Sequence, residues 1–379
     1  MDLALVRQEF PITKRKIYLD NASLSPLPKR VIDAATAELR DRGERAVDGF
    51  WDWLATLDRT RNAIARLIAA SDDEVTFTQN TSEGINIVAS MLDWREGDNV
   101  VLNNLEYYPN AYPWLNLARR GVESRIVRHR RGRIDPADIA ALADRRTRVV
   151  ALSHVAWING LRHDLSAVAE ICRSVGAYLC VDAIQSIGAS PVDVRHGVDF
   201  LAAGSHKWLM APLGLGVFYC RKELLERFQP PYVGWQSDDR GLSSQEYGFR
   251  ETFTAGRTAR RFNHGNINIA AVYGLAASLT LLEELGWNAV FARNRMLADR
   301  IVEGLTRAGM TFLSPLDAAM RSNIVNVLPR DLSIAMNRLA AANIAVSSRG
   351  GGVRISPAFF NTESEIDRLV EVILASEKT

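Results

Sequence analysis

The feature that most constrains the fold is an alternation of short apolar runs with amphipathic segments through the middle of the chain. The helix that Asp164 can cap shows it well, because apolar residues recur on one face from Leu165 to Val175. Strands that alternate with amphipathic helices form a mostly parallel sheet, so the pattern predicts an α/β fold. We predict strands at 74–78, 99–103, 148–155, 177–181, 198–202 and 214–220, and further helical stretches at about 82–92 and 109–120.

The pattern changes after Gly256, which indicates a second and smaller domain. A long predicted helix at 269–285 is followed by a shorter α+β region that ends in an amphipathic helix at 363–376. A chain of 379 residues also exceeds the size at which one hydrophobic core usually stops growing. We therefore predict a large α/β domain at 16–255, and a small domain made of residues 1–15 together with 256–379.

Charge and apolar composition argue against nucleic acid and membrane partners. The formal net charge is only +2, and no stretch approaches the roughly 18 apolar residues needed to span a bilayer. The first residues, MDLALVRQEFPITKRK, lack a continuous apolar core, so we expect no signal peptide and a cytoplasmic protein. Three cysteines without close spacing argue against a disulfide framework or a metal site.

Arginines cluster in two places. Arg125, Arg128, Arg130, Arg131 and Arg133 are typical of a solvated face. A second cluster, formed by Arg257, Arg260 and Arg261, stands where the chain could meet an anionic ligand, and the sequence leaves that role open.

Polar and aromatic side chains follow four of the predicted strands. In a parallel α/β sheet, ligands bind beyond the carboxyl ends of the strands, so such residues are candidates for a site. Each one alone has an ordinary explanation as a turn, cap or loop residue, and only their combination is informative. The residues are Asp182, Lys207, the pair Thr81 and Ser82, and Tyr107.

Together these residues supply the four kinds of group that pyridoxal 5′-phosphate (PLP) requires. The amine of Lys207 can form an imine with the cofactor aldehyde, and burial lowers the pKa of such an amine. Asp182 can face the pyridine nitrogen and keep it protonated. A helix N-terminus that carries Thr81 and Ser82 can bind the phosphate, and the ring of Tyr107 can stack on the cofactor. The sequence therefore predicts a PLP enzyme that acts on an amino-acid-like amine.

Segments along nearly the whole chain resemble the class V aminotransferase family of fold-type I PLP enzymes, and within it the cysteine desulfurase-like branch. Asp-x-x-Gln at 182–185 and Ser-His-Lys at 205–207 are the most specific of them. The resemblance implies a large domain with a mostly parallel sheet and a smaller α+β C-terminal domain. The matching segments are YLDNASLSPLP, FTQNTSEGIN, LEYYPN, LSHVAWINGLRHDL, VDAIQSIGA, GSHKWLMAPLGLG, RRFNHGNIN and GVRISPAFFNT.

The resemblance also implies a role for each matching residue. Lys207 would be the catalytic residue that holds PLP as a Schiff base, and Asp182 would pair with the pyridinium. Gln185 would hydrogen-bond the ring oxygen, and Asn266 would reach the phosphate of a neighbouring subunit, so a homodimer is expected. The predicted cofactor-binding set is Thr81, Ser82, Tyr107, Asp182, Gln185, Ser205, His206, Lys207 and Asn266. The predicted substrate-binding set is Arg354, Ala22 and Trp157, with Arg354 as a bidentate ligand of the α-carboxylate.

Three departures from the desulfurase pattern bear on the reaction. Tyr107 stands where desulfurases commonly carry a stacking histidine, and Trp157 where they often carry asparagine. The segment before Arg354, AVSSRGGGVRIS, is short and lacks the mobile cysteine that a desulfurase needs. The three cysteines, Cys172, Cys180 and Cys220, lie in a predicted helix and two predicted strands, so sulfur transfer to a protein thiol is not expected.

Several reactions remain open for such a site. Analogy with the branch that cleaves at the β-carbon favours β-elimination, as in a carbon–sulfur lyase, on the matches at Gln185 and the Ser-His-Lys segment. A class V aminotransferase and an amino-acid epimerase are the enzymatic alternatives. An inactive homologue that serves as a binding subunit is a further alternative, although the intact Lys207, Asp182 and His206 argue against it. A nucleotide-binding module would need a Gly-x-Gly-x-x-Gly loop, which the sequence lacks. Substrate identity stays open.

Overall fold

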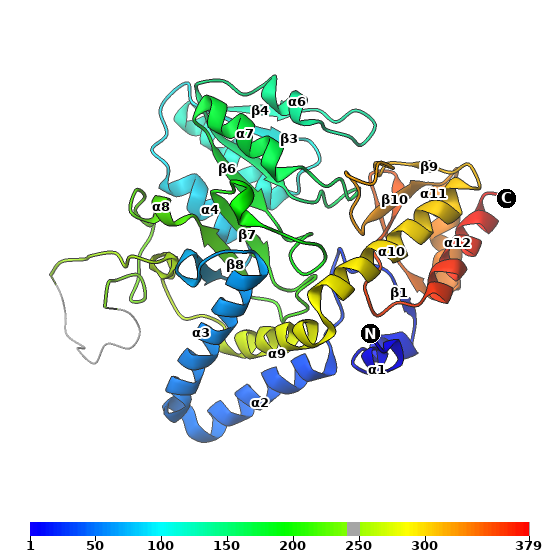
Figure 1. Ribbon diagram of the computed structural model, residues 1–379, viewed down its shortest axis with the longest axis horizontal. Helices are drawn as coiled ribbons and strands as arrows, with labels where there is room; N and C mark the ends of the chain where they lie inside the picture. The colour runs from blue at the N-terminus through cyan, green and yellow to red at the C-terminus, as the bar shows by residue number, and fades with distance from the viewer. Residues whose placement is uncertain (241–250, 379) are drawn as a thin grey trace.

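The central element of the fold is a seven-stranded sheet with the order β2-β8-β7-β6-β5-β3-β4 (Figure 1). The computed structural model describes residues 1–240 and 251–378. In this sheet β8 is antiparallel to both of its neighbours, and the other described pairs are parallel, which confirms the predicted mostly parallel α/β fold. The strands are β2 (Val75–Thr78), β3 (Asn99–Asn103), β4 (Glu123–Val127), β5 (Thr147–Ser153), β6 (Tyr178–Asp182), β7 (Phe200–Gly204) and β8 (Gly216–Cys220).

The reversed direction of β8 follows from the connection that precedes it. Parallel neighbours need a crossover, usually a helix, whereas antiparallel neighbours can be joined by a short loop. Residues 205–215, between β7 and β8, contain no α-helix. This loop returns the chain directly at the carboxyl end of β7, and it carries Lys207.

Helices cover both faces of the central sheet. The side chains of β6 show the two faces, because Leu179 and Val181 join a core with α3, α7 and α9, whereas Tyr178 and Cys180 join a core with α4. Such alternation is the period of a strand that is buried on both sides. The helices around this sheet are α2 (Lys29–Arg45), α3 (Phe50–Leu67), α4 (Thr81–Met91), α5 (Tyr112–Leu115), α6 (Pro136–Ala140), α7 (Leu165–Val175), α8 (Lys222–Leu225) and α9 (Ile269–Leu285).

A second, four-stranded antiparallel sheet with the order β12-β13-β10-β9 forms the centre of the C-terminal part. Its helices pack with Leu19, Val325 and Ile355 in a separate core. The elements of this part are α10 (Trp287–Thr306), β9 (Thr311–Phe312), β10 (Val325–Leu328), α11 (Leu332–Ala341), β12 (Ser347–Arg349), β13 (Gly352–Ile355) and α12 (Glu363–Ser376).

The N-terminal segment joins this C-terminal part. After α1 (Leu3–Gln8), β1 (Ile17–Tyr18) pairs in parallel with β11 (Ile344–Ala345), and Asp20 bridges to Ser356. α9, by contrast, packs against α2 and α3 beside the large sheet. These contacts show which segments lie beside each sheet. The domain boundaries at 15/16 and 255/256 stay a prediction.

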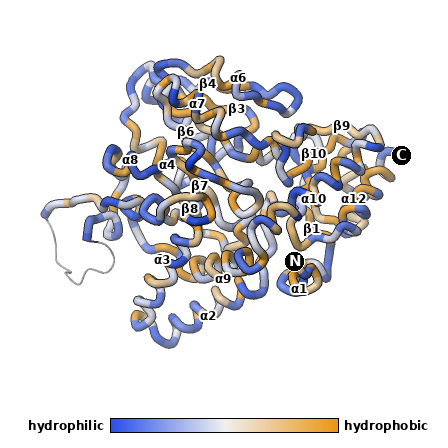
Figure 2. Tube along the Cα trace, viewed as in Figure 1, coloured by the Kyte–Doolittle hydropathy of each residue, from blue (hydrophilic) through white to orange (hydrophobic). Residues whose placement is uncertain are grey.

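No single helix in the described ranges is both long enough and apolar enough to cross a membrane. α9 and α10 reach that length and apolar content only when they are taken together, and the two helices are bent by 83° relative to each other. Apolar residues mark α9 in Figure 2, where the helix lies between α2 and the large sheet. Val272, Leu275 and Leu282 of this helix are fully buried in the protein.

Candidate active site

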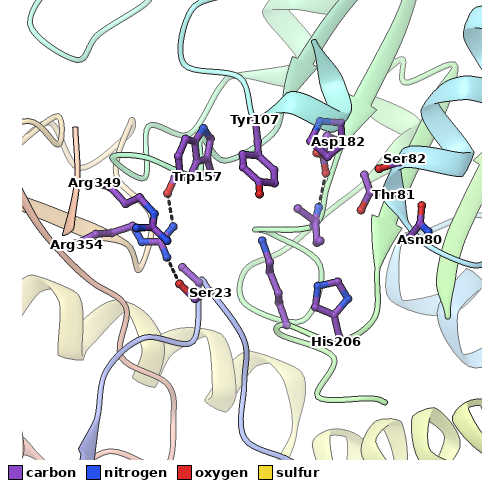
Figure 3. Close-up of a pocket in the computed structure, with 14 residues that line it drawn as sticks. Ser23, Asn80, Thr81, Ser82, Tyr107, Trp157, Asp182, His206, Arg349 and Arg354 are labelled. Carbon is purple, nitrogen blue, oxygen red and sulfur yellow. Dashed lines mark hydrogen bonds between the residues drawn. The ribbon is translucent and has the colours of Figure 1, made fainter. Parts of the chain in front are cut away.

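A cavity of about 490 Å³ lies at the carboxyl ends of the central strands and collects most of the predicted site residues (Figure 3). The predicted residues that line it are Ala22, Thr81, Ser82, Tyr107, Trp157, Asp182, His206, Lys207 and Arg354. Its other lining residues, which the sequence did not single out, are Ser23, Asn80, Pro109, Ile184 and Arg349. Segments that are distant in the sequence therefore meet in one cavity.

Lys207 lies in the β7–β8 loop, which backbone hydrogen bonds hold in shape. Met210 N donates to Lys207 O at 2.9 Å, and Ala211 N donates to Ser205 O at 3.0 Å. The side chain is almost fully buried, and this burial lowers the pKa of the amine, against the opposing charge of Asp182. A buried amine with a lowered pKa is suited to act as a nucleophile and a base.

Asp182 ends β6 and turns its carboxylate into the cavity. Its Oδ1 accepts a hydrogen bond from Ile184 N at 2.9 Å, and no side chain of the described residues donates to it. Burial raises the pKa of this carboxyl, and the nearby charge of Glu106 raises it further. A buried carboxylate that faces an enclosed space without a cationic hydrogen-bond partner fits a ligand with a protonated ring nitrogen.

Glu106 is a second carboxylate behind this part of the cavity. Its oxygens accept four hydrogen bonds of 2.6–2.9 Å, from the amides of Asn103 and Asn110 and from the backbone N–H and hydroxyl of Ser153. Burial raises its pKa, and these hydrogen bonds oppose that shift. Glu106 thus ties the loop that carries Tyr107 to the end of β5. No sequence pattern singled out Glu106 as a site residue, although it stands next to Tyr107 in the segment LEYYPN.

The N-terminus of α4 lies on another side of the cavity and presents an anion-binding arrangement. Asn80 caps the helix by accepting a hydrogen bond from Glu83 N at 3.0 Å. Thr81 Oγ1 accepts from Gly204 N at 2.8 Å, so its hydroxyl proton can be donated to a ligand. First-turn N–H groups and the positive end of the helix favour a phosphate beside Thr81 and Ser82.

His206 lies near this helix terminus, as Figure 3 shows. Burial lowers its pKa to about 4, so the imidazole is neutral at physiological pH and can both donate and accept a hydrogen bond. Gly204 allows this placement, because a Cβ at that position would lie 2.8 Å from His206 Cε1. The groups on this side of the cavity therefore fit a phosphate.

Arg354 lies across the cavity from α4 (Figure 3) and is nearly fully buried. Its Nε donates to Ser347 Oγ at 3.1 Å, and one terminal nitrogen donates to Trp157 O at 2.8 Å. The other terminal nitrogen donates to Asp20 Oδ1 at 3.1 Å and to Ser23 Oγ at 2.5 Å. A buried guanidinium held in this way is an anchor for an anion on the substrate side.

Comparison with known proteins agrees with this site. Residues 17–369 match the sequence model of the aminotransferase class V family. The chain belongs to this family. A probable cysteine desulfurase of Methanothermobacter thermautotrophicus is 32% identical over 97% of this chain and 96% of its own length. A cysteine desulfurase of Salmonella agona is 30% identical over 96% of each chain.

Solved structures of cysteine desulfurases are also similar to this chain. The cysteine desulfurase of Thermococcus onnurineus NA1 aligns with a TM-score of 0.88 at 27% identity, over 99% of this chain and 98% of its own. Membership of the class V family makes this protein a PLP-dependent enzyme of the cysteine desulfurase-like branch, as the sequence predicted. The charges and donors that line the cavity fit PLP at its ring nitrogen and at its phosphate.

Gln185, which the resemblance places near the ring oxygen of the cofactor, is not among the residues that line the cavity. Its Nε2 donates to Ala22 O at 2.9 Å, and its Oε1 accepts from Trp208 Nε1 at 3.0 Å. The side chain is fully buried. In this class V enzyme Gln185 thus links the N-terminal segment at Ala22 to the loop of Lys207, and its contact with a cofactor stays a prediction.

Ser205 and Asn266 also lie outside the cavity. The hydroxyl of Ser205 is buried and donates to Leu215 O at 2.7 Å, so it stabilises the Lys207 loop. Asn266 is exposed beside a different cavity, near Trp235, which leaves its predicted reach into a neighbouring subunit as a prediction.

The arginine cluster at 257–261 lines a separate cavity of about 530 Å³. Arg260 forms an ion pair with Asp58 at 2.9 Å, and Arg261 donates to Gln229 Oε1 at 2.9 Å. Neither arginine, nor Arg257, lines the cavity that holds Lys207. The cluster therefore contributes no group to the substrate cavity of the same chain.

The three cysteines of the sequence are all buried, with exposed fractions of 2% or less. None of them lines the cavity with Lys207. Burial raises the pKa of Cys172 to about 12 and also raises those of Cys180 and Cys220. Each thiol is therefore protonated and shielded, which is unfavourable for a nucleophile.

Proposed function

We propose that this class V enzyme catalyses β-elimination from an amino acid with a leaving group on its β-carbon, as a carbon–sulfur lyase does. The observation that carries the proposal is a cavity that brings together Lys207, Asp182 and the N-terminus of α4 but is lined by no thiol of the three cysteines. A desulfurase needs a reactive cysteine to take up sulfur, and a lyase releases the leaving group to solvent. Relatives named as cysteine desulfurases support chemistry at a carbon–sulfur bond.

The residues of the chain divide the work of this reaction. PLP, when bound, supplies an electron sink that stabilises negative charge at the substrate α-carbon. Lys207 Nζ, with its lowered pKa, accepts the proton from that carbon. Asp182 would balance the charge of a protonated ring nitrogen, and Tyr107 and Trp157, with ring centroids 4.8 Å apart, would form the aromatic wall beside the cofactor and the substrate. Arg354 holds the substrate on the side opposite α4.

Product analysis with L-cysteine separates the proposal from its alternatives. Free sulfide, pyruvate and ammonia in equal amounts are expected for the lyase. A new amino acid formed from an added keto acid would instead identify an aminotransferase, and loss of optical activity alone an epimerase. Alanine together with an enzyme-bound persulfide would identify a desulfurase, and a purified protein without visible absorption would favour an inactive homologue.

Removal of all thiols tests the proposal by substitution. Replacement of Cys172, Cys180 and Cys220 by alanine or serine is expected to leave the turnover number within about twofold, because no thiol lines the cavity. Turnover is measured per folded molecule, with the melting temperature as a control, because all three positions are in the core. A loss of turnover in a variant that keeps its melting temperature would contradict elimination without a thiol.

We also propose a cytoplasmic homodimer, in which Asn266 contacts the phosphate of the partner's cofactor. The exposure of Asn266 outside its own active-site cavity supports this arrangement. Sedimentation would test the assembly, and Asn266→Ala should weaken PLP binding without altering the monomer fold.

A further inference from the structure

A continuous row of aromatic rings leads from the cavity to exposed residues of the same segment. Tyr107 and Trp157 line the cavity, with ring centroids 4.8 Å apart. The ring of Tyr108 lies 5.3 Å from that of Tyr107, and the rings of Tyr108 and Tyr112 stack at 4.9 Å with an interplanar angle of 26°. These separations are typical of favourable aromatic pairs. In the view of Figure 3 the ring of Tyr107 lies between Trp157 and Asp182, so the row begins beside the predicted cofactor site.

The outer part of this row is exposed to solvent. Tyr108 and Tyr112 are 56% and 59% exposed, and neither is among the residues that line the cavity. Leu115, at the other end of α5 from Tyr112, is also exposed and lies on the same helix face. Single exposed apolar side chains are common on proteins, whereas a contiguous apolar patch is typical of a binding site. The patch formed by Tyr108, Tyr112 and Leu115 is continuous with the cavity wall at Tyr107.

Buried residues hold the segment that carries these rings. Asn110 and Trp114 are fully buried, and Trp114 Nε1 donates a hydrogen bond to Asn110 Oδ1 at 3.1 Å. The amide of Asn110 in turn donates to Glu106 Oε2 at 2.9 Å, and its backbone N donates to Tyr107 O at 2.9 Å. An aromatic surface that is already fixed in one geometry loses little conformational entropy when it binds a ligand.

The other walls of the cavity carry groups suited to other parts of the reactants. Lys207, Asp182 and the N-terminus of α4 fit the cofactor, and the buried guanidinium of Arg354 fits an anion. The side chain of the amino acid then remains for the aromatic wall. A small leaving group, such as the thiol of cysteine, would leave the rings of Tyr108 and Tyr112 uncovered, because they lie beyond that wall.

We propose that the substrate carries an aromatic ring on the sulfur attached to its β-carbon, and that Tyr108 and Tyr112 bind this ring by stacking. This substrate class rests on the proposed function, because it assumes a leaving group at the β-carbon. Elimination from such a substrate breaks the bond between the β-carbon and sulfur. With one molecule of water, the products are the thiol that carries the ring, pyruvate and ammonium.

Equilibrium binding to the PLP-loaded enzyme, followed by its visible absorption, tests the ring contact without any elimination. The probes are L-2-amino-5-phenylpentanoate and L-norvaline, which have a CH₂ group where the substrate has sulfur, and only the first carries a ring. Tyr112→Ala is expected to weaken binding of the phenyl probe by about fivefold, because a stacking contact is lost. Additional replacement of Tyr108 by alanine should bring the loss to about tenfold or more. Binding of L-norvaline should change by less than about twofold in both variants.

Turnover of a second pair of compounds tests the substrate class. S-benzyl-L-cysteine and S-methyl-L-cysteine both release an alkanethiol, and they differ in the ring. The two variants should lower kcat/KM for the benzyl compound by the same factors as in binding and leave that for the methyl compound nearly unchanged. Failure of the lyase assignment would instead abolish cleavage of both compounds, and the difference in binding between the phenyl probe and L-norvaline would remain.

Tyr112→Phe is the matched control, because it keeps the ring, and it should bind both probes as the unmodified enzyme does. The exposed positions should leave the melting temperature of all variants unchanged. Unchanged binding of the phenyl probe by the double variant would overturn the proposal. Equal weakening of both probes would also overturn it, because the tyrosines would then act on the whole cavity. An altered sedimentation coefficient with unchanged binding would identify the patch as a subunit contact and would overturn it as well.

Discussion

Lys207→Ala is expected to abolish turnover and to remove the visible absorption of the lysine-bound cofactor, while the protein stays folded. The imine requires this amine, and no other lysine of the described residues lines the cavity. The fold should tolerate the change, because no described side chain accepts a hydrogen bond from Lys207 and burial disfavours its charge. Turnover, the absorption spectrum and the melting temperature of the cofactor-free protein are measured together.

Lys222→Ala, at an exposed position of α8, is the matched control and should keep both absorption and turnover. After borohydride reduction of the unmodified enzyme, mass spectrometry is expected to place the cofactor on the peptide that contains GSHKW. Cofactor attached to another lysine would contradict the assignment, as would turnover in Lys207→Ala near that of the unmodified protein.

Six of the seven strands of the central sheet, and some of the helices, could be predicted because their signals are local. The predicted strand at 99–103 and the helices at 269–285 and 363–376 have the observed bounds, and Asp164 caps α7 as expected. The direction of β8 was not predicted, since it depends on the absence of a helix in the loop before it. β4 was missed because its edge position leaves much of it exposed, so it lacks the apolar run of a central strand.

The part of the site built on strand ends could also be predicted, because topology brings those positions together. Asp182, Lys207 and Thr81 each follow or end a strand of one sheet, and they line one cavity. Ser23 and Arg349 could not be predicted in this way. Their positions depend on the pairing of the N-terminal segment with the C-terminal part, which no local pattern in the sequence encodes.

Hydrogen bonds within the protein explain why the structure gives no support to the predicted contact of Gln185 with the cofactor. The family resemblance places Gln185 near the cofactor, but it does not show which protein groups already form hydrogen bonds with its amide. In the structure both ends of the amide are bound to protein, to Ala22 O and to Trp208 Nε1. Buried amides usually find such partners, and they are known only once the chain has folded.

Asp182→Asn is expected to lower turnover by about 100-fold or more, while PLP remains bound. An amide cannot balance the charge of a protonated ring nitrogen, and the loss of an electrostatic partner in a buried site commonly costs ~3 kcal/mol. Single-turnover rates and the bound PLP content are compared with those of the unmodified enzyme. Asp199→Asn is the matched control, because Asp199 is also buried but pairs with Arg221 at 2.9 Å, away from the cavity. Activity of Asp182→Asn within a few-fold would show that another group balances the ring.

The effect of Asp182→Asn on the melting temperature should depend on whether PLP is bound. Burial raises the pKa of Asp182 above its ordinary value of 3.8, so without PLP its contribution to stability is full below that value and is lost as the pH rises through the folded-state pKa. At pH 8 the cofactor-free Asp182→Asn protein should therefore melt at or above the temperature of the unmodified protein. With PLP bound, the cationic ring compensates the buried carboxylate, and the unmodified protein should gain more in melting temperature than the variant. An equal gain in both proteins would contradict an ion pair between Asp182 and the cofactor.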